Sequence, residues 1–133
     1  MKPSKAKIVK SLQVGALIKS CDNSGAKILR LISVKGHKTT KGRRSAAGVS
    51  DFITASVVEG IPSMRKQMVN AIIVRQKKEY RRADGTRIKF EDNAAIVLKD
   101  EKGNPKGKIF KGPIAKEAAE RWTEVAKIAS IIV

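Results

Sequence analysis

The chain has 133 residues, of which 29 are Lys or Arg and 12 are Asp or Glu, so its formal net charge is +17. This length fits one compact domain over residues 1–133, and a hydrophobic fraction of 41% excludes a chain that is disordered throughout. So much positive charge on a small domain repels itself and becomes favourable beside a polyanion. A nucleic acid is therefore the first candidate partner, and an anionic membrane is the second.

The middle of the chain predicts short strands separated by turns. Residues 52–58 alternate, with Ile53, Ala55 and Val57 on one face. Further strand-like runs cover residues 28–34, 71–74, 86–90 and 94–98. Turn signals stand at 23–25, 83–85 and 102–105, and Asp84-Gly85 is the strongest hairpin signal. The pattern predicts a mainly β fold in the form of a small closed barrel.

The pattern changes after Gly112-Pro113, since proline is tolerated in the first turn of a helix. Residues 115–122 are rich in alanine and carry Glu117 and Arg121 at i,i+4 spacing, which predicts a helix. Thr123 is a candidate cap for a second short helix that runs through residue 128. We therefore expect a barrel over about residues 1–112 and a short helical C-terminal segment over about 113–133.

Positive charge is concentrated early in the chain, with a net +11 over residues 1–50, +5 over 51–90 and +1 over 91–133. Segment 35–44 has two glycines and no acid, so we expect a mobile loop that follows an RNA backbone closely. Segment 75–82 leaves a predicted strand and enters a turn, so we expect a better anchored docking surface. For one such run alone, a solvated surface without a ligand is the competing interpretation. The cations expected to contact RNA are Lys35, Lys38, Lys41, Arg43, Arg44, Arg65, Lys66, Arg75, Lys77, Lys78, Arg81 and Arg82.

RNA is favoured over DNA because the sequence has no recognition-helix motif, zinc-ligand set or leucine heptad, and a barrel with basic loops suits irregular RNA. Tyr80 either packs against its neighbours or stacks on a base. Trp122 either anchors the predicted helices to the barrel or lies on a surface. The near-neutral last third predicts a surface that faces protein. Its expected polar rim is Lys108, Lys111, Lys116 and Arg121.

The sequence lacks the combinations of residues that catalysis requires. Cys21 and His37 are a candidate nucleophile pair, but nothing in the sequence brings them together. Glu91 and Asp92 are adjacent, so on a strand they point to opposite faces. One His and one Cys cannot build a structural zinc site, and no phosphate-binding glycine loop is present. We expect no catalytic residue, no metal and no cofactor.

The sequence also argues against membrane insertion and secretion. No apolar run reaches the ~20 residues that cross a bilayer, and no signal-type apolar block follows the first residues. The single cysteine fits a reducing compartment. We therefore expect a cytoplasmic protein with no membrane partner.

Spaced blocks of the sequence resemble a known family. Ala71-Ile72-Ile73-Val74 is followed at fixed spacing by Asp84-Gly85, Phe90, Asn93 and Ile96-Val97. Further matching blocks lie at 22–27, 55–57, 60–62, 74–77 and 112–117. Over about residues 12–133 the chain resembles the universal large-subunit ribosomal protein L-fourteen family, called L-twenty-three in eukaryotes. The 75–82 block and the Arg121-Trp122 pair are similar to its archaeal and eukaryotic branch, and the short N-terminal tail is similar to the archaeal members.

The resemblance implies a five-stranded barrel with a C-terminal helical segment, seated on large-subunit rRNA. It also implies three further partners: neighbouring large-subunit ribosomal proteins, small-subunit rRNA at an intersubunit bridge, and a factor that keeps free subunits apart. Two positions depart from the family pattern, Ile96 where Val is usual and Ser50 where Gly is usual. We expect Ser50 to alter at most one turn and no proposed contact.

Two other classes stay open at this stage. A single-stranded nucleic-acid chaperone or translation-factor barrel needs aromatic side chains on adjacent strands, and the chain has only five aromatics in all. A membrane-surface protein needs a basic amphipathic helix with large apolar residues opposite, whereas the predicted C-terminal helices carry as many acids as bases.

Overall fold

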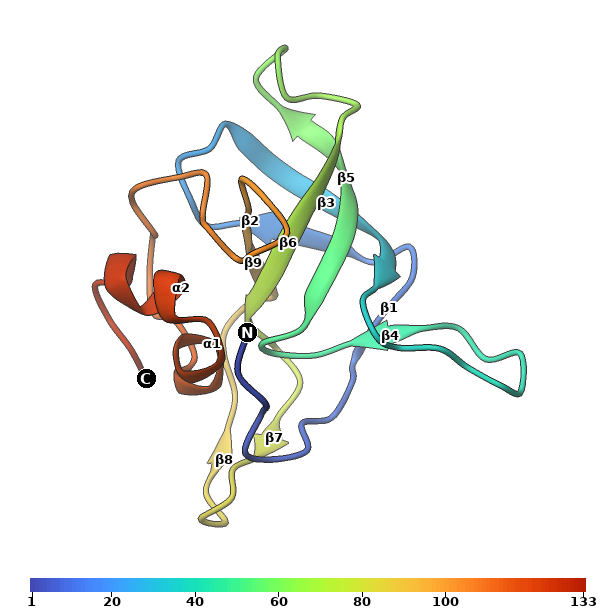
Figure 1. The fold of residues 1–133 in the computed structure, drawn as a ribbon, viewed down its shortest axis with the longest axis vertical. Helices are drawn as coiled ribbons and strands as arrows, with labels where there is room; N and C mark the ends of the chain where they lie inside the picture. Colours follow the sequence, from blue (N-terminus) through green and yellow to red (C-terminus); the bar gives the residue numbers. More distant parts are fainter.

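A computed structural model describes residues 1–133 and shows a closed barrel with short helices packed on its outside (Figure 1). The barrel strands, in spatial order, are β2 (Leu17–Ser20), β3 (Ala26–Val34), β5 (Phe52–Gly60), β6 (Met68–Arg75) and β9 (Ala94–Val97). Neighbouring strands are antiparallel, except that β2 and β9 pair in parallel and close the barrel. Two small ladders lie outside it: β1 (Leu12–Gln13) pairs with β4 (Ala46–Ala47), and β7 (Tyr80–Arg81) pairs with β8 (Arg87–Ile88).

Inward-facing side chains fill the barrel completely. On β5 the alternation places Ile53, Ala55 and Val57 inside, where each is at most 2% exposed. Alanines are common among the interior residues, and a five-stranded barrel has a narrow interior that suits small side chains. The barrel interior is therefore a packed hydrophobic core.

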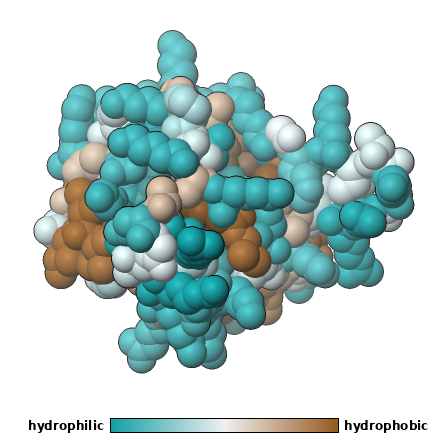
Figure 2. Space-filling model, turned by 90° about the horizontal axis from the view of Figure 1, so that it is seen from below, coloured by the Kyte–Doolittle hydropathy of each residue, from teal (hydrophilic) through white to brown (hydrophobic).

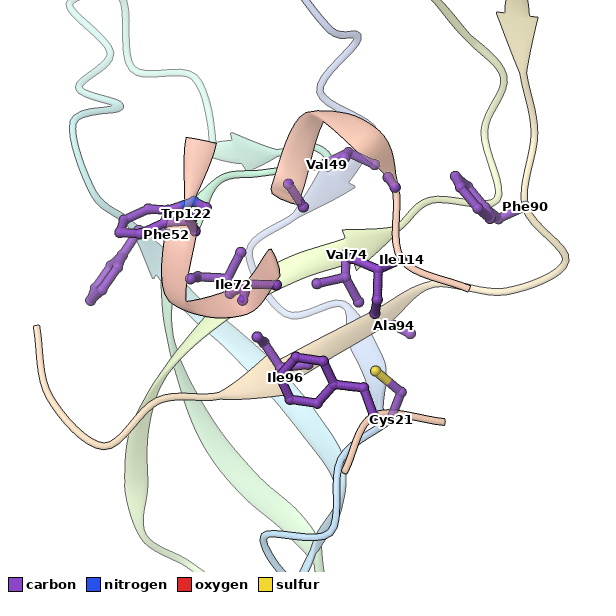
Figure 3. Close-up of a cluster of buried hydrophobic side chains, with 14 of the residues drawn as sticks. Cys21, Val49, Phe52, Ile72, Val74, Phe90, Ala94, Ile96, Ile114 and Trp122 are labelled. Carbon is purple, nitrogen blue, oxygen red and sulfur yellow. The ribbon is translucent and has the colours of Figure 1, made fainter. Parts of the chain in front are cut away.

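A second core lies between the outer face of β6 and β9 and the C-terminal segment. That segment contains α1 (Lys116–Arg121) and α2 (Thr123–Ile128). Because helices cover this side of the sheet, β6 is apolar on both faces over its residues 71–74: Ala71 and Ile73 face the barrel interior, and Ile72 and Val74 face the helices. Figure 3 shows this outer layer gathered around Ile72, Val74 and Ile114.

Trp122 fixes the helices to the barrel. Its indole is 4% exposed, lies 5.8 Å from the Phe52 ring between centroids, and donates from Nε1 to the Ser50 carbonyl at 2.9 Å (Figure 3). Gly103 lies so close beneath the indole that a Cβ there would be 2.6 Å from Cε3. The anchoring interpretation of Trp122 is therefore confirmed.

Most predicted elements are present, and the fold class is confirmed. The runs at 28–34, 52–58, 71–74 and 94–98 lie in β3, β5, β6 and β9, both C-terminal helices form, and Asp84-Gly85 is a hairpin turn with Gly85 at φ 93°. The run at 86–90 is strand only at Arg87–Ile88. Strand β2 was not predicted. The expected Thr123 cap is wrong, because Trp122 occupies the N-cap position and no side chain caps the helix.

Ser50 has more consequence than the sequence suggested. It is 2% exposed, and its φ of 74° is in the left-handed region, which favours glycine. Its carbonyl accepts from Trp122 Nε1 at 2.9 Å and from Arg121 Nη1 at 3.2 Å. The expectation that Ser50 touches no proposed contact residue is therefore wrong.

Candidate nucleic-acid interface

Three basic elements project from the barrel in different directions. Figure 1 shows the β3–β4 loop at the right, the β5–β6 loop at the top and the β7–β8 hairpin at the bottom. Viewed from the hairpin end, hydrophilic side chains stand out around the molecule, including the projecting loop at the right (Figure 2). A ligand that meets all three elements must surround much of the protein, as a folded RNA does.

The β3–β4 loop carries five exposed cations, Lys35, Lys38, Lys41, Arg43 and Arg44. It has a defined path of its own. The Thr39 hydroxyl donates to the Arg43 carbonyl at 2.7 Å, and His37 Nδ1 accepts the Ala46 N–H at 3.0 Å. Gly36 and Gly42 have φ of 80° and 70°, the conformation expected of glycines that reverse a loop. Lys35 Nζ lies 5.1 Å from the centroid of the Phe52 ring, and the side chains of the other four cations are exposed.

The other two elements are shorter. On the β5–β6 loop Arg65 and Lys66 are exposed, and the Lys66 N–H donates to the Val57 carbonyl at 3.0 Å. In the β7–β8 hairpin Asp84 Oδ1 accepts the Thr86 N–H at 2.9 Å, a bond that lowers the pKa of Asp84. Arg81 projects from this hairpin, and Lys77 and Lys78 project from the segment that leads into it.

Three of the predicted contact residues are instead used inside the protein. Arg75 is 8% exposed; its Nε lies 2.9 Å from Asp92 Oδ1, and its Nη1 donates to the carbonyls of Lys111 and Pro113 at 2.9 and 3.1 Å. These bonds tie the end of β6 to the start of the C-terminal segment. Four of the five guanidinium N–H donors are occupied, so we expect Arg75 to stabilise the fold rather than contact RNA.

Arg82 and Arg121 are engaged in the same way. Arg82 Nε lies 2.7 Å from Glu117 Oε1, and its Nη2 donates to the carbonyl of Val133 at 2.5 Å. Arg121 donates to the carbonyls of Lys2 and Ser50, both at 3.2 Å, and lies 3.4 Å from Asp51 Oδ1. Together with Arg75, these residues form what we call the internal arginines.

Aromatic side chains contribute nothing to an exposed binding surface. Tyr80 is 1% exposed and its hydroxyl donates to Glu117 at 2.8 Å, so the packing interpretation is confirmed; burial raises its pKa. The other four aromatics, Phe52, Phe90, Phe110 and Trp122, are each at most 7% exposed. No platform for stacking bases is therefore present on the barrel surface, which removes the main feature required of a single-stranded nucleic-acid chaperone.

On the C-terminal side, Lys108, Lys111 and Lys116 are exposed. Lys116 is only loosely paired, with Nζ 3.9 Å from Glu120 Oε1. The Lys111 main chain is fixed between Cys21, whose carbonyl accepts its N–H at 2.7 Å, and the Arg75 guanidinium. Of the four cations predicted on this surface, three are free to meet a partner and Arg121 is not.

No catalytic arrangement is present. The Cys21 thiol is 4% exposed and burial raises its pKa to about 11, so it is not a nucleophile at neutral pH. Asp92 is paired with Arg75, whereas Glu91 is exposed, so the two carboxylates do not act together. No group of three or more His, Cys, Asp or Glu side chains is placed to hold a metal ion. Neither helix is long and apolar enough to cross a membrane.

Sequence reasoning missed isolated cations that the fold brings beside the predicted ones. Lys19 on β2 and Lys89 after β8 stand alone in the sequence, yet both lie next to Lys77 in the structure. Alternation along β2, where Ile18 is buried and Lys19 is exposed, is a signal that would have oriented Lys19 outward.

The closed barrel and its projecting cations define a basic β-barrel protein. Residues 11–133 match the family model described as "Ribosomal protein L14p/L23e". "Large ribosomal subunit protein uL14" of Nanoarchaeum equitans is 58% identical over 133 residues, which is 100% of both chains. The proteins of the same name from Methanothrix thermoacetophila and Methanococcus vannielii are 50% identical over 100% and 54% identical over 99% of each chain.

The chain therefore belongs to the ribosomal protein L14p/L23e family. It is a structural protein of the large ribosomal subunit and not an enzyme, and the relatives named above are archaeal. The predicted resemblance and the predicted ribosomal localisation are confirmed.

Proposed function

We propose that the chain binds large-subunit rRNA through the exposed cations of its three projecting elements. The main support is that most of the predicted cations are exposed. Of the sixteen cations predicted to contact RNA or to lie on the C-terminal surface, thirteen are exposed and three are the internal arginines. Among the thirteen, only Lys116 has an acidic partner within the protein. Unpaired, solvated cations on loops are what phosphate binding requires, because they release counterions and lose little internal bonding on docking.

The test is the salt dependence of binding to purified large-subunit rRNA. We expect a log–log slope steeper than about −4, since each neutralised phosphate contributes slightly less than one unit. An affinity that barely changes with salt would contradict phosphate docking.

The exposed cations also differ in how firmly they are held. Lys77 and Arg81 stand next to β6 and on β7, whereas Lys38, Lys41 and Arg43 stand on a long loop. Single replacements by glutamine at Lys77 or Arg81 should weaken binding more than those in the loop, because the loop loses more conformational freedom on docking. Larger losses from the loop variants in competition binding would reverse this ranking.

The C-terminal segment has a separate role in this proposal. Lys108, Lys111 and Lys116 form a surface that meets a neighbouring large-subunit protein, small-subunit rRNA at an intersubunit bridge, and a factor that keeps subunits apart. The support is the low net charge of residues 91–133 together with the exposure of these three lysines. A main rRNA anchor would need more unbalanced positive charge.

Reversing charge at Lys108 and Lys116 tests this division. The variant should enter large subunits normally, while the gradient profile should show more free large subunits and fewer joined ribosomes. If the variant is absent from large subunits although the purified protein is folded, these lysines are rRNA anchors and the division is incorrect.

A further inference from the structure

Two adjoining hollows lie beside the barrel, on the side where β2 meets the segment after β8. One has a volume of about 560 Å³ and is lined by Lys77, Lys78 and Lys89; the other, of about 260 Å³, is lined by Lys19 and again by Lys77. Asn93 lines both. The two hollows share Lys77 and Asn93 in their linings and therefore adjoin; we call them together the four-lysine cleft.

Two of the three acidic side chains that line the cleft form ion pairs with arginines outside it. Asp92 lies 2.9 Å from Arg75, and Glu79 lies 3.1 Å from Arg87. Glu91 alone has no ion-pair partner, and none of the four lysines is paired with an acid in the protein. The cleft therefore presents an excess of positive charge in a concave setting, where the fields of several cations add.

Asn93, which lines both hollows, has hydrogen-bond donors to spare. It accepts the Lys77 N–H through Oδ1 at 2.8 Å, which leaves its amide N–H groups as donors.

We propose that the four-lysine cleft holds the sugar–phosphate backbone of a single RNA strand, an inference that rests on the proposed rRNA-binding function. Phosphates meet the lysines on either side of Lys77, and the Asn93 amide donates to a phosphate or ribose oxygen between them. Two adjoining hollows fit a chain with a repeated anionic group. Backbone contacts of this kind position a protein without reading bases, which suits a site that contains no exposed aromatic ring.

The sharpest test uses the two lysines that belong to no basic run. The double variant Lys19→Gln/Lys89→Gln should flatten the log–log salt slope for large-subunit rRNA by about 1.4 units, equivalent to roughly 25-fold weaker binding at 0.1 M salt if the non-electrostatic part is unchanged. The matched control Lys99→Gln/Lys102→Gln loses the same charge from exposed lysines that line neither hollow. It should keep the wild-type slope, and both variants should keep the wild-type melting temperature.

Chemical acetylation of lysines, read by mass spectrometry, gives an independent measurement on the full-length protein. Lys19, Lys77, Lys78 and Lys89 should react in the free protein and be protected on purified rRNA. If the loop lysines are protected on rRNA while Lys19 and Lys89 still react, the proposal that the cleft holds RNA is overturned, whereas the proposed rRNA binding stands. Protection only in assembled subunits would identify a protein as the occupant and overturn the RNA assignment. If no lysine is protected on rRNA and the affinity does not change with salt, both the cleft and the proposed rRNA binding are overturned.

Discussion

Replacing Arg75 with glutamine separates fold stabilisation from RNA binding within one basic segment. The Arg75 guanidinium makes four bonds: two to the Asp92 carboxylate, at 2.9 and 3.4 Å, and one each to the Lys111 and Pro113 carbonyls, at 2.9 and 3.1 Å. The Arg75 side chain is 10% exposed. Glutamine cannot span these acceptors, so Asp92 loses its counter-charge and two carbonyls lose their donors.

The expected loss of stability follows from burial. Removing one partner of a buried ion pair costs about 3–5 kcal/mol. The Asp92 side chain is 30% exposed and regains some hydration, so we expect the lower end of that range, about 3 kcal/mol. For a chain of 133 residues this corresponds to a fall in Tm of about 10 °C. Arg75→Lys should lose more than half as much, because a single ammonium cannot reproduce the planar fork although it keeps the charge.

The matched control is Lys77→Gln, which removes the same charge from an exposed side chain two positions away. Its Tm should stay within about 2 °C of the wild type, while its affinity for rRNA should fall by roughly fivefold at 0.1 M salt. Calorimetry and filter binding on both variants supply the comparison. An Arg75→Gln protein that melts normally and binds RNA as weakly as Lys77→Gln would refute the internal assignment of Arg75.

Three further changes probe the packing. Ser11→Ala should raise Tm by about 3–4 °C in thermal melts, because it removes a buried polar atom without a partner, worth about 1 kcal/mol; no gain would mean that water satisfies the hydroxyl. Gly103→Ala should lower the free energy of unfolding in urea by about 2–4 kcal/mol, since the φ of Gly103 is +95° and the new Cβ meets the Trp122 ring. Gly85→Ala, where φ is +93° but the new Cβ meets open space, should lower it by only about 1 kcal/mol. Burial raises the pKa of the Cys21 thiol from 9.0 to about 11. The stability that the buried neutral thiol contributes is complete below pH 9 and is lost as pH rises through 11, which lowers the free energy of unfolding by up to about 2–3 kcal/mol. A Cys21→Ala variant should show a correspondingly shallower decline, and equal declines would contradict this origin.

The sequence patterns that succeeded are those set by local geometry. Alternation over β5 follows from one face being buried, and the unbroken apolar run in β6 follows from burial on both faces. Strand β2 escaped because it has four residues and an exposed Leu17, which breaks the apolar pattern. Its position comes from parallel pairing with β9, a contact between residues more than seventy positions apart that no local pattern records.

The basic segment at 75–82 shows what sequence alone could not separate, namely exposed cations from cations that are paired within the protein. Arg75, Lys77 and Arg82 are equivalent as charges in the sequence, yet only Lys77 is free to meet a ligand. The distinction depends on carboxylates 17 and 35 residues away, Asp92 and Glu117, which only the folded chain brings within reach. The cleft at Lys19 and Lys89 was missed for the converse reason, because cations that are isolated in the sequence converge in space.

Residue type nonetheless carries part of the answer. All three internal cations are arginines, and each serves acceptors from at least two different residues at once, which the planar guanidinium allows and a single ammonium does not. Removal of charge at Arg75, Arg82 or Arg121 should therefore deplete the protein from ribosomes by loosening the C-terminal segment, even though none of these side chains need touch RNA. Scans of basic residues in small RNA-binding proteins confound these two causes unless each variant's melting temperature is measured beside its affinity. Lysines, whose charge is seldom tied into such internal networks, give the cleaner measure of phosphate contact.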